Sequence, residues 1–398
     1  MTLSIERRAE LWGDRTAIVD VAEARLDVPS ETVDERRVSY AELSARSERL
    51  AAGLAATGIG ADDAVAVLSR NRIDAIALAF ACRRLGATFA PISHRLTPAT
   101  VSRPLERIEP TIVVHEPAQR DLVRVLAPTD TATFADLADA GTDPPPETPP
   151  ADDDPLWYVH GDGGAPVVAF SREAVERNCV AAAATFGFGR RDSAPLLLPL
   201  SSPDGLLRAA FPLLYVGGTL LLDRAFDPGD ALEATRRANA TVLVGRETEY
   251  RELANRDGFA EALSSVSRFV CEMPIDERVR NALLERGVSL VGARGYLACP
   301  TALVTVVDAA DAAESGYRPV LDCSARLVDD GVLEGAGEGR LQLSGPLLAD
   351  GSVDRVESGD GDDSEREVEA DDGGRFVNGW FDTGTRVRRD DRGVYYPI

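Results

Sequence analysis

Residues 64–91, AVAVLSRNRIDAIALAFACRRLGATFAP, indicate the fold class of this chain. The short apolar run at 64–68 predicts a buried strand. The apolar spacing over 73–85 predicts a helix, which Gly86 can end in the left-handed conformation. Residues 88–91 then predict a second buried strand. Strands that alternate with helices of this length form βαβ units, so we predict an α/β fold with mostly parallel sheets.

The same alternation continues on both sides of this stretch. Ser39 and Glu42 form a capping box at the start of a helix. After residue 301 the pattern changes to short strands and turns. We therefore predict two αβ subdomains over 1–141 and 155–300, a Pro-rich acidic linker over 142–154, and a small β-rich subdomain over 301–398. The acidic, Gly/Ser-rich stretch 350–374 is predicted to be a disordered loop.

The charge of the chain is extreme. Its 398 residues include no lysine, so all 43 basic residues are arginine, and 66 acidic residues bring the net charge to −23. Such a charge repels itself in dilute salt and is screened at molar salt. We interpret the chain as a cytoplasmic protein of an extreme halophile, most simply an archaeal one. The alternative is an ordinary acidic protein from a GC-rich genome. Neither interpretation favours a nucleic-acid partner.

The cysteines and the hydropathy pattern exclude other classes of protein. The five cysteines lie far apart and form no CxxC pair, which argues against a zinc site or a disulfide framework and fits a reducing interior. No uninterrupted apolar run approaches 18 residues, so we expect no membrane span. We also expect no metal-ligand cluster.

Segment 86–98, GATFAPISHRLTP, resembles a recurring stretch of the AMP-forming acyl-CoA and aryl-CoA synthetases, which belong to the adenylate-forming superfamily. Four more segments resemble the family in the same order: 154–166, 198–219, 241–250 and 379–384. The resemblance implies two αβ subdomains and a distorted β-barrel, with the active site at their junction. It also implies a reaction in which an acyl or aryl carboxylate attacks Mg-ATP and a thiol such as coenzyme A then displaces AMP.

The nucleotide-binding positions depart from the family pattern. The phosphate loop TSGTTGxPK corresponds to 159–167, VHGDGGAPV, which gives Gly161, Asp162, Gly163 and Gly164 as cofactor-binding candidates. The loop hydroxyls are absent, and the lysine position is Val167. The loop could still bind nucleotide through backbone amides, with Asp162 holding a metal. We favour the simpler interpretation of a structural turn from a strand to a helix.

Two further nucleotide motifs are also changed. The family's YGxTE corresponds to Arg294, Gly295 and Tyr296, followed by Leu297 and Ala298. Tyr296 could stack on a base, although a core position is the simpler interpretation. The ribose-binding aspartate that ends GWFxTGD is Thr385 here. Asp382 lies three residues earlier, and on a regular strand it would face the opposite side.

The acyl-pocket segment supplies a second set of candidates. By resemblance, Leu200, Gly205 and Arg208 line the substrate pocket, and His160 lies beside the phosphate loop. Arg208 could face a carboxylate, but we expect it to face solvent.

Two functional hypotheses follow. The chain ends at Ile398, before the family's small C-terminal domain with its second essential lysine, so we expect only the large N-terminal domain. The favoured hypothesis is a descendant with weak or lost activity that keeps the acyl cleft and works beside a full-length ligase. The alternative is an active short acid–thiol ligase for an aliphatic, aryl or o-succinylbenzoate-type acid, working with a separate C-terminal domain.

Overall fold

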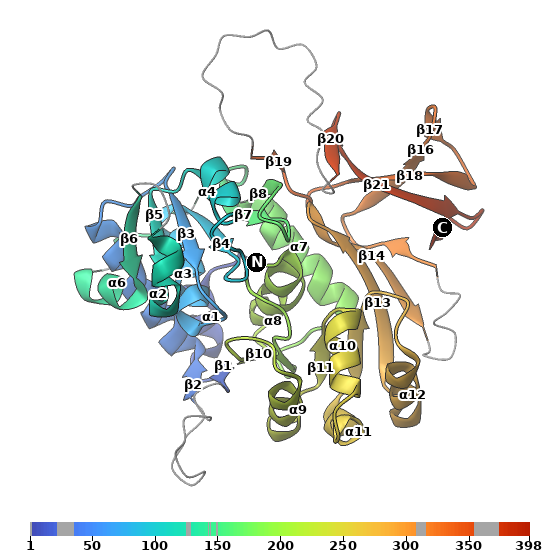
Figure 1. Ribbon diagram of the computed structural model, residues 1–398, viewed down its shortest axis with the longest axis horizontal. Coiled ribbons are helices and arrows are strands. Elements are labelled where there is room, and N and C mark those ends of the chain that lie inside the picture. The colour runs from blue at the N-terminus through green and yellow to red at the C-terminus, as the bar shows by residue number, and fades with distance from the viewer. Residues whose placement is uncertain are drawn as a thin grey trace.

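The computed structural model describes residues 2–21, 36–124, 129–141, 143, 145–148, 150–307, 316–353 and 374–398. Within these ranges the strands form four sheets. The parallel strands gather in three sheets, and the fourth sheet, near the C-terminus, is antiparallel (Figure 1). The predicted α/β class with mostly parallel sheets is therefore confirmed.

The largest sheet contains the βαβ unit predicted first. Its order is β19-β8-β7-β4-β3-β5-β6, and β3 to β7 run parallel. Helix α2 begins at the predicted capping box, and α3 ends at Gly86, whose φ of 75° only glycine adopts easily. The elements are β3 (Ala64–Leu68), β4 (Thr88–Ile92), β5 (Ile112–His115), β6 (Asp130–Thr133), β7 (Pro155–His160), β8 (Val167–Ser171) and β19 (Gly351–Ser352), with α2 (Tyr40–Ala56), α3 (Ile73–Leu85) and α6 (Phe134–Ala140).

Two further sheets are joined by a single parallel bridge between Leu196 and Val244. The first has the order β2-β1-β10-β9, and the second β11-β12-β13-β14-β15. Strands β11, β12 and β13 run parallel, β14 runs antiparallel to β13, and β15 runs antiparallel to β14. Their bounds are β1 (Thr16–Asp20), β2 (Arg36–Ser39), β9 (Ser193–Pro195), β10 (Thr219–Leu222), β11 (Val242–Val244), β12 (Arg268–Cys271), β13 (Ser289–Tyr296), β14 (Cys299–Val307) and β15 (Arg318–Pro319).

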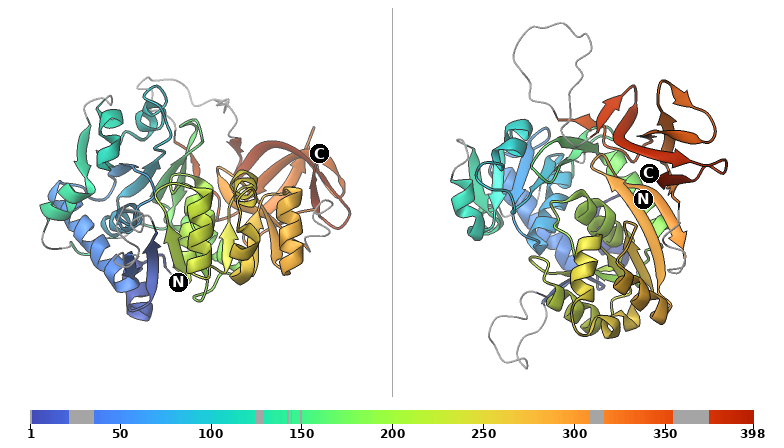
Figure 2. Two further views of the ribbon diagram at one scale, coloured as in Figure 1. Left: turned by 60° about the horizontal axis from the view of Figure 1, so that its bottom comes forward. Right: turned by 45° about the vertical axis from the view of Figure 1, so that its right-hand side comes forward.

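The fourth sheet is built from strands near the C-terminus and lies beside β14 (Figure 2). Its order is β17-β16-β18-β21-β20; β20 pairs with the first residues of β21 and β22 with its last residues. A bridge between Tyr317 and Tyr395 ties it to the rest of the molecule. The strands are β16 (Ser324–Val328), β17 (Val332–Leu333), β18 (Gly337–Ser344), β20 (Arg375–Val377), β21 (Trp380–Arg389) and β22 (Tyr395–Pro397).

Helix α7 (Arg172–Phe186) lies in the middle of the molecule (Figure 1). The Ser171 hydroxyl accepts a hydrogen bond from the Ala174 amide and starts the helix, and Gly187 ends it in the left-handed conformation. The helix contacts β7, β8 and β14, so it joins the sheets into one core.

The other helices pack mostly around the sheets joined by the Leu196–Val244 bridge. They are α1 (Ile5–Trp12), α4 (Ser102–Ile108), α5 (Arg120–Val123), the π-helix η3 (Asp204–Ala210), α8 (Phe211–Tyr215), α9 (Pro228–Arg237), α10 (Glu247–Ala254), α11 (Phe259–Ala262) and α12 (Glu277–Arg286), together with the short 3₁₀ turns η2 (Pro117–Gln119) and η4 (Leu263–Ser265). Among the described residues, no helix combines the length and the hydropathy that crossing a bilayer requires.

The sheets cross the predicted subdomain boundaries. Strands β7 and β8 follow the 142–154 segment but belong to the same sheet as β3 to β6, whereas β1 pairs with β10.

The first residues of the acidic stretch 350–374 pack on the rest of the protein, although a disordered loop was predicted there. Gly351 and Ser352 pair with β8, and the Asp350 carboxylate accepts a hydrogen bond from the Ser171 amide. Residues 354–373 of that stretch lie outside the described residues.

Candidate functional site

The glycine-rich segment 161–166 is a tight turn between β7 and β8, which run antiparallel. It therefore joins two strands, not a strand and a helix as predicted. The Gly161 amide donates to the Pro166 carbonyl and the Gly164 amide to the Gly161 carbonyl, both at 2.9 Å. Because these bonds close the turn on itself, neither of the two amides is free to bind a ligand.

The position of the family's lysine is part of the core. Val167 opens β8, has 0% of its surface exposed, and packs in an apolar cluster with Leu68, Ile92 and Leu96. A charged group at this position would be buried among aliphatic side chains.

His160 ends β7, and hydrogen bonds occupy both of its ring nitrogens. Its Nε2 accepts from the Ser93 amide at 3.0 Å, so Nδ1 carries the proton and donates to the Gly161 carbonyl at 2.6 Å. Burial lowers the pKa of His160, which keeps the ring neutral. The histidine thus fastens the residue after β4 to the glycine turn.

Two cations lie near the glycine turn. Arg103, on α4, donates from Nη1 to the Gly163 carbonyl at 3.4 Å. Arg246 is close enough to Asp162 for that carboxylate to contribute to its raised pKa; burial acts in the opposite direction, and Asp204 contributes more. Neither arginine adjoins the glycine segment in sequence, because Arg103 lies well before it and Arg246 well after it.

Arg294, Gly295 and Tyr296 form the end of β13, where the chain turns back into β14. The Tyr296 ring packs against the core at 6.5 Å, centroid to centroid, from Phe381. Burial raises the pKa of Tyr296, and the Arg294 guanidinium, 5.9 Å from the ring centroid, lowers it. This placement fits the core interpretation of Tyr296.

Thr385 lies on β21 where the strand is irregular. Between Asp382 and Arg386 the ladder to β18 shifts register, and Gly384 takes a φ of 68°. The regular alternation assumed from the sequence therefore does not apply here. Asp382 is buried and accepts a hydrogen bond from Gln342 at 3.1 Å, and the side chains of Thr383 and Thr385 act on the pKa of Tyr296.

Arg208 is buried, not solvent-facing as predicted. It lies in the π-helix η3 with 3% of its surface exposed. Its Nε and Nη2 donate to the Pro300 carbonyl at 2.9 and 2.6 Å, and Nη2 lies 3.0 Å from the Asp204 carboxylate. A Cβ on Gly295 would collide with the same guanidinium and with the Pro300 carbonyl, which explains the glycine.

Leu200 lies just before η3 and Gly205 lies in its first turn, and hydrogen bonds fix the backbone of both residues. The Leu200 amide donates to Asn71 at 2.8 Å, and the Gly205 amide donates to the Ser202 hydroxyl at 3.0 Å. Both residues are buried. Their backbone contacts fix where η3 begins, and with it the position of Asp204.

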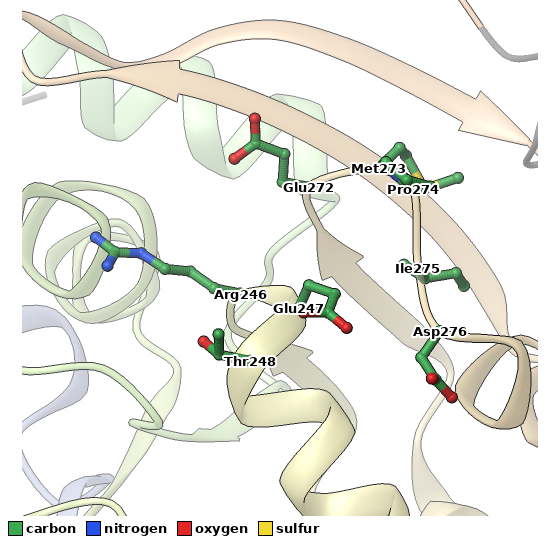
Figure 3. Close-up of a pocket in the computed structure, with 8 residues that line it drawn as sticks. All are labelled: Arg246, Glu247, Thr248, Glu272, Met273, Pro274, Ile275 and Asp276. Carbon is green, nitrogen blue, oxygen red and sulfur yellow. The ribbon is translucent and has the colours of Figure 1, made fainter.

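A pocket lies where β11 and β12 end. It has a volume of about 620 Å³ and is lined by Arg246, Glu247, Thr248, Glu272, Met273, Pro274, Ile275 and Asp276. Figure 3 shows Arg246, Thr248 and Glu272 toward one side and the segment from Met273 to Asp276 toward the other. The pocket thus has a polar side and a largely apolar side.

The charges around the pocket are paired. Glu247 lies 3.2 Å from Arg251, Glu272 lies 3.7 Å from Arg294, and Asp276 accepts from the Arg278 amide at 2.8 Å. Arg246 lies 2.8 Å from Asp204, which it shares with Arg208. Burial alone would raise the pKa of Asp204, but the two guanidiniums hold it below its usual value.

The second wall of this pocket, Glu272 to Asp276, is not among the residues predicted from the sequence, although the resemblance includes segment 241–250. A signal exists, because parallel strands present their carboxyl ends at one edge of a sheet and ligands bind there. The residues after the predicted strands 241–244 and 268–271 were therefore candidates. Within the described ranges, no three His, Cys, Asp or Glu side chains are arranged to hold a metal ion.

Comparison with solved structures gives the same overall fold. O-succinylbenzoate coenzyme A synthetase (MenE) from Bacillus subtilis superposes with a TM-score of 0.82 at 20% identity, over 100% of this chain and 79% of the other. The N-terminal domain of FACL13 from Mycobacterium tuberculosis gives 0.83 at 22% identity, over 98% of this chain and 97% of that domain.

Sequence comparison gives the family. Feruloyl-CoA synthase from Amycolatopsis sp is 31% identical over 91% of this chain and 73% of its own length. Indoleacetate–CoA ligase from Aromatoleum aromaticum is 28% identical over 97% of this chain and 77% of its own length. The family model for AMP-binding enzymes matches residues 5–352. The chain therefore belongs to the AMP-binding enzyme family.

Proposed function

We propose that this chain binds an acyl or aryl carboxylic acid in the pocket at the ends of β11 and β12 and contributes little or no adenylation of that acid by itself. The acid would lie with its body against the apolar segment Met273–Ile275 and its polar end toward Arg246. The relatives support an organic acid as the ligand class, because three of the four compared are named for ferulate, indoleacetate and o-succinylbenzoate.

The observation that carries this proposal is the state of the glycine turn. Two of its amides are bonded within the turn, Val167 is in the core, and Asp162 carries the wrong charge for a polyphosphate. The hairpin after Tyr296 offers Leu297 and Ala298 in place of a hydroxyl and a carboxylate. These residues do not fit a magnesium-bound triphosphate, so we derive no step through ATP. Loss of one charge-stabilising donor in an active site typically lowers kcat about 10²- to 10³-fold.

A second candidate function is an active acid–thiol ligase that uses ATP and coenzyme A together with a separately supplied C-terminal domain. One observation favours it: Arg103 contacts the Gly163 carbonyl and Arg246 lies near Asp162, so two guanidiniums flank the turn. Cations from other elements could then substitute for the lysine of the family pattern.

Pyrophosphate exchange into ATP separates the two candidates. The purified chain would be assayed at about 2 M KCl with aliphatic and aryl acids, alone and with a family C-terminal domain added. We expect acid binding without exchange above the rate of a boiled sample. Robust exchange by the chain alone would overturn the proposal, and exchange only with the added domain would favour the second candidate.

Arg103→Gln and Arg107→Gln form a matched pair for any exchange that is seen. Both residues lie on α4, but only Arg103 contacts the turn. If the second candidate is correct, Arg103→Gln lowers exchange at least about 10-fold and Arg107→Gln leaves it unchanged.

A further inference from the structure

Arg246 immediately precedes α10, and hydrogen bonds fix both its backbone amide and its side chain. Its amide donates to the Glu249 carboxylate at 3.1 Å, and its Nε donates to the Asp204 carboxylate at 2.8 Å. The side chain is 37% exposed and lines the pocket. Among the residues that the structure describes, neither of its terminal nitrogens donates a hydrogen bond. The guanidinium therefore has a fixed orientation and keeps its two outer donor groups available.

Asp204 cannot neutralise Arg246 fully, because it also serves Arg208. The Arg208 guanidinium lies 3.0 Å from the same carboxylate and is anchored by two hydrogen bonds to the Pro300 carbonyl. Two guanidiniums thus share one carboxylate, and of the two only Arg246 reaches the pocket. A second carboxylate on the pocket side would balance this pair of charges.

The acidic side chains of the pocket do not fill that role. Glu247 is paired with Arg251, Glu272 lies next to Arg294, and Asp276 accepts a hydrogen bond at the start of α12. Asp162 acts on Arg246 through its charge, but no hydrogen bond joins the two in the part of the chain described.

We propose that Arg246 is the carboxylate-recognition residue of the pocket and binds both oxygens of the acid through Nη1 and Nη2. This inference rests on the proposed function. A planar guanidinium with two parallel N–H groups matches a carboxylate, and such charge-assisted pairs are short and strong. Asp204 and Arg208 are positioning residues, because they fix the guanidinium without reaching the ligand. The body of the acid then extends toward Met273, Pro274 and Ile275.

The test compares an acid with its uncharged amide of the same shape. Dissociation constants for ferulate, indoleacetate and octanoate, and for their primary amides, would be measured by calorimetry at about 2 M KCl. We expect the wild type to bind at least one acid roughly 10-fold more tightly than its amide. In Arg246→Gln the ratio should fall to about 1, while the affinity for the amide changes less than about 2-fold.

Two further variants control the result. Arg246→Lys keeps the charge but loses the bidentate geometry, so it should keep only part of the preference for the acid. Arg256→Gln changes an exposed arginine just beyond the end of α10, away from the pocket lining, and should leave the ratio unchanged. Circular dichroism spectra would confirm that each variant folds.

The outcomes separate the inference from the proposed function. If no acid or amide binds to the wild type, both are overturned. If acids and amides bind the wild type equally well, or if Arg246→Gln keeps the full preference for the acid, the pocket binds organic ligands but Arg246 is not the recognition residue. Even if a variant fails to fold, equal binding of acid and amide by the wild type would overturn the role of Arg246.

Discussion

The glycine turn and the pocket differ in how their polar groups are used. In the turn, the Gly161 and Gly164 amides and both His160 nitrogens bond to the protein itself, and the lysine position is an aliphatic core residue. In the pocket, Arg246 keeps outward-facing donors beside a space of about 620 Å³. The difference teaches that two regions of one fold can use their polar groups in opposite ways, one to close the backbone on itself and the other to leave donors available at a pocket. Each prediction below would break or sharpen this contrast.

The largest expected effect acts on both regions at once. Lowering KCl from about 2 M to about 0.1 M lengthens the screening distance from roughly 2–3 Å to about 10 Å, so the net charge of −23 repels itself more strongly. We expect the melting temperature to fall by about 10 °C or more. A thermal melt that does not depend on salt would contradict the halophilic interpretation of the composition.

Restoring the family's lysine should harm the protein. Val167→Lys would place an ammonium among buried aliphatic side chains and lower the free energy of unfolding by about 4 kcal/mol. Denaturant titration measures the loss. Val332→Lys, at a position that is 56% exposed, is the matched control and should stay within about 0.5 kcal/mol of the wild type. A stable Val167→Lys variant that gains exchange activity would show that the turn is still a nucleotide site.

The next largest loss of stability is expected from the Glu116 clamp, the pair of ion pairs that Arg70 and Arg72 make with Glu116. Arg70 and Arg72 both contact the buried Glu116 carboxylate at 2.8 Å, and between them Asn71 bonds to Leu200, ahead of η3. Glu116→Gln should cost about 3 kcal/mol of the free energy of unfolding at pH 7. Glu106→Gln, at an exposed position, is the control. A Glu116→Gln protein as stable as the wild type would show that the clamp contributes nothing.

The same ion pairs predict that the free energy of unfolding falls in acid. Burial alone would raise the pKa of Glu116, but Arg70 and Arg72 lower it to about 2 from the ordinary value of 4.5. Because the folded pKa lies below the unfolded one, this stabilisation is complete above pH 4.5 and is lost as the pH falls toward 2. In Glu116→Gln the fall of stability over this window should be shallower.

A smaller pH effect should come from the turn. Burial lowers the pKa of His160, so the unfolded chain takes up the proton first as the pH falls below about 6.5. Stability is therefore complete above that pH and declines below it, by no more than about 1.4 kcal/mol per pH unit, the limit for one proton. The slope between pH 6.5 and 5 should be shallower in His160→Gln, and an unchanged slope would show that His160 does not contribute to the pH dependence.

The smallest expected effect lies on the polar side of the pocket. Glu272→Gln removes a negative charge near Arg246, so an acid should bind about 3-fold more tightly while its amide is unaffected. Glu252→Gln, on the exposed side of α10, is the control. Equal gains for acid and amide would point to a change of shape and not of charge.

Local signals predicted the fold better than the site. The capping box at Ser39, the stop at Gly86 and the strands of residues 64–91 depend on neighbours in sequence, and the structure has each of them. The burial of Arg208 depends on Pro300, 92 residues away, and no local pattern encodes that contact. The environment of Thr385 depends on a register shift that regular alternation cannot predict. The predictions that failed are therefore those that depend on contacts between segments far apart in sequence.

The π-helix η3 has a consequence for how this site can evolve. A π turn closes between residues i and i+5 and is commonly an α-helix that has gained one residue. Removing a single alanine at 209 or 210 would let the segment rewind and rotate Asp204 by roughly 100° relative to the helix that follows. Arg246 would then lose its counter-ion, whereas Arg208 would turn together with Asp204, because both precede the deleted residue. A one-codon deletion, far smaller than a redesigned cleft, could thus reset which ligands this fold accepts.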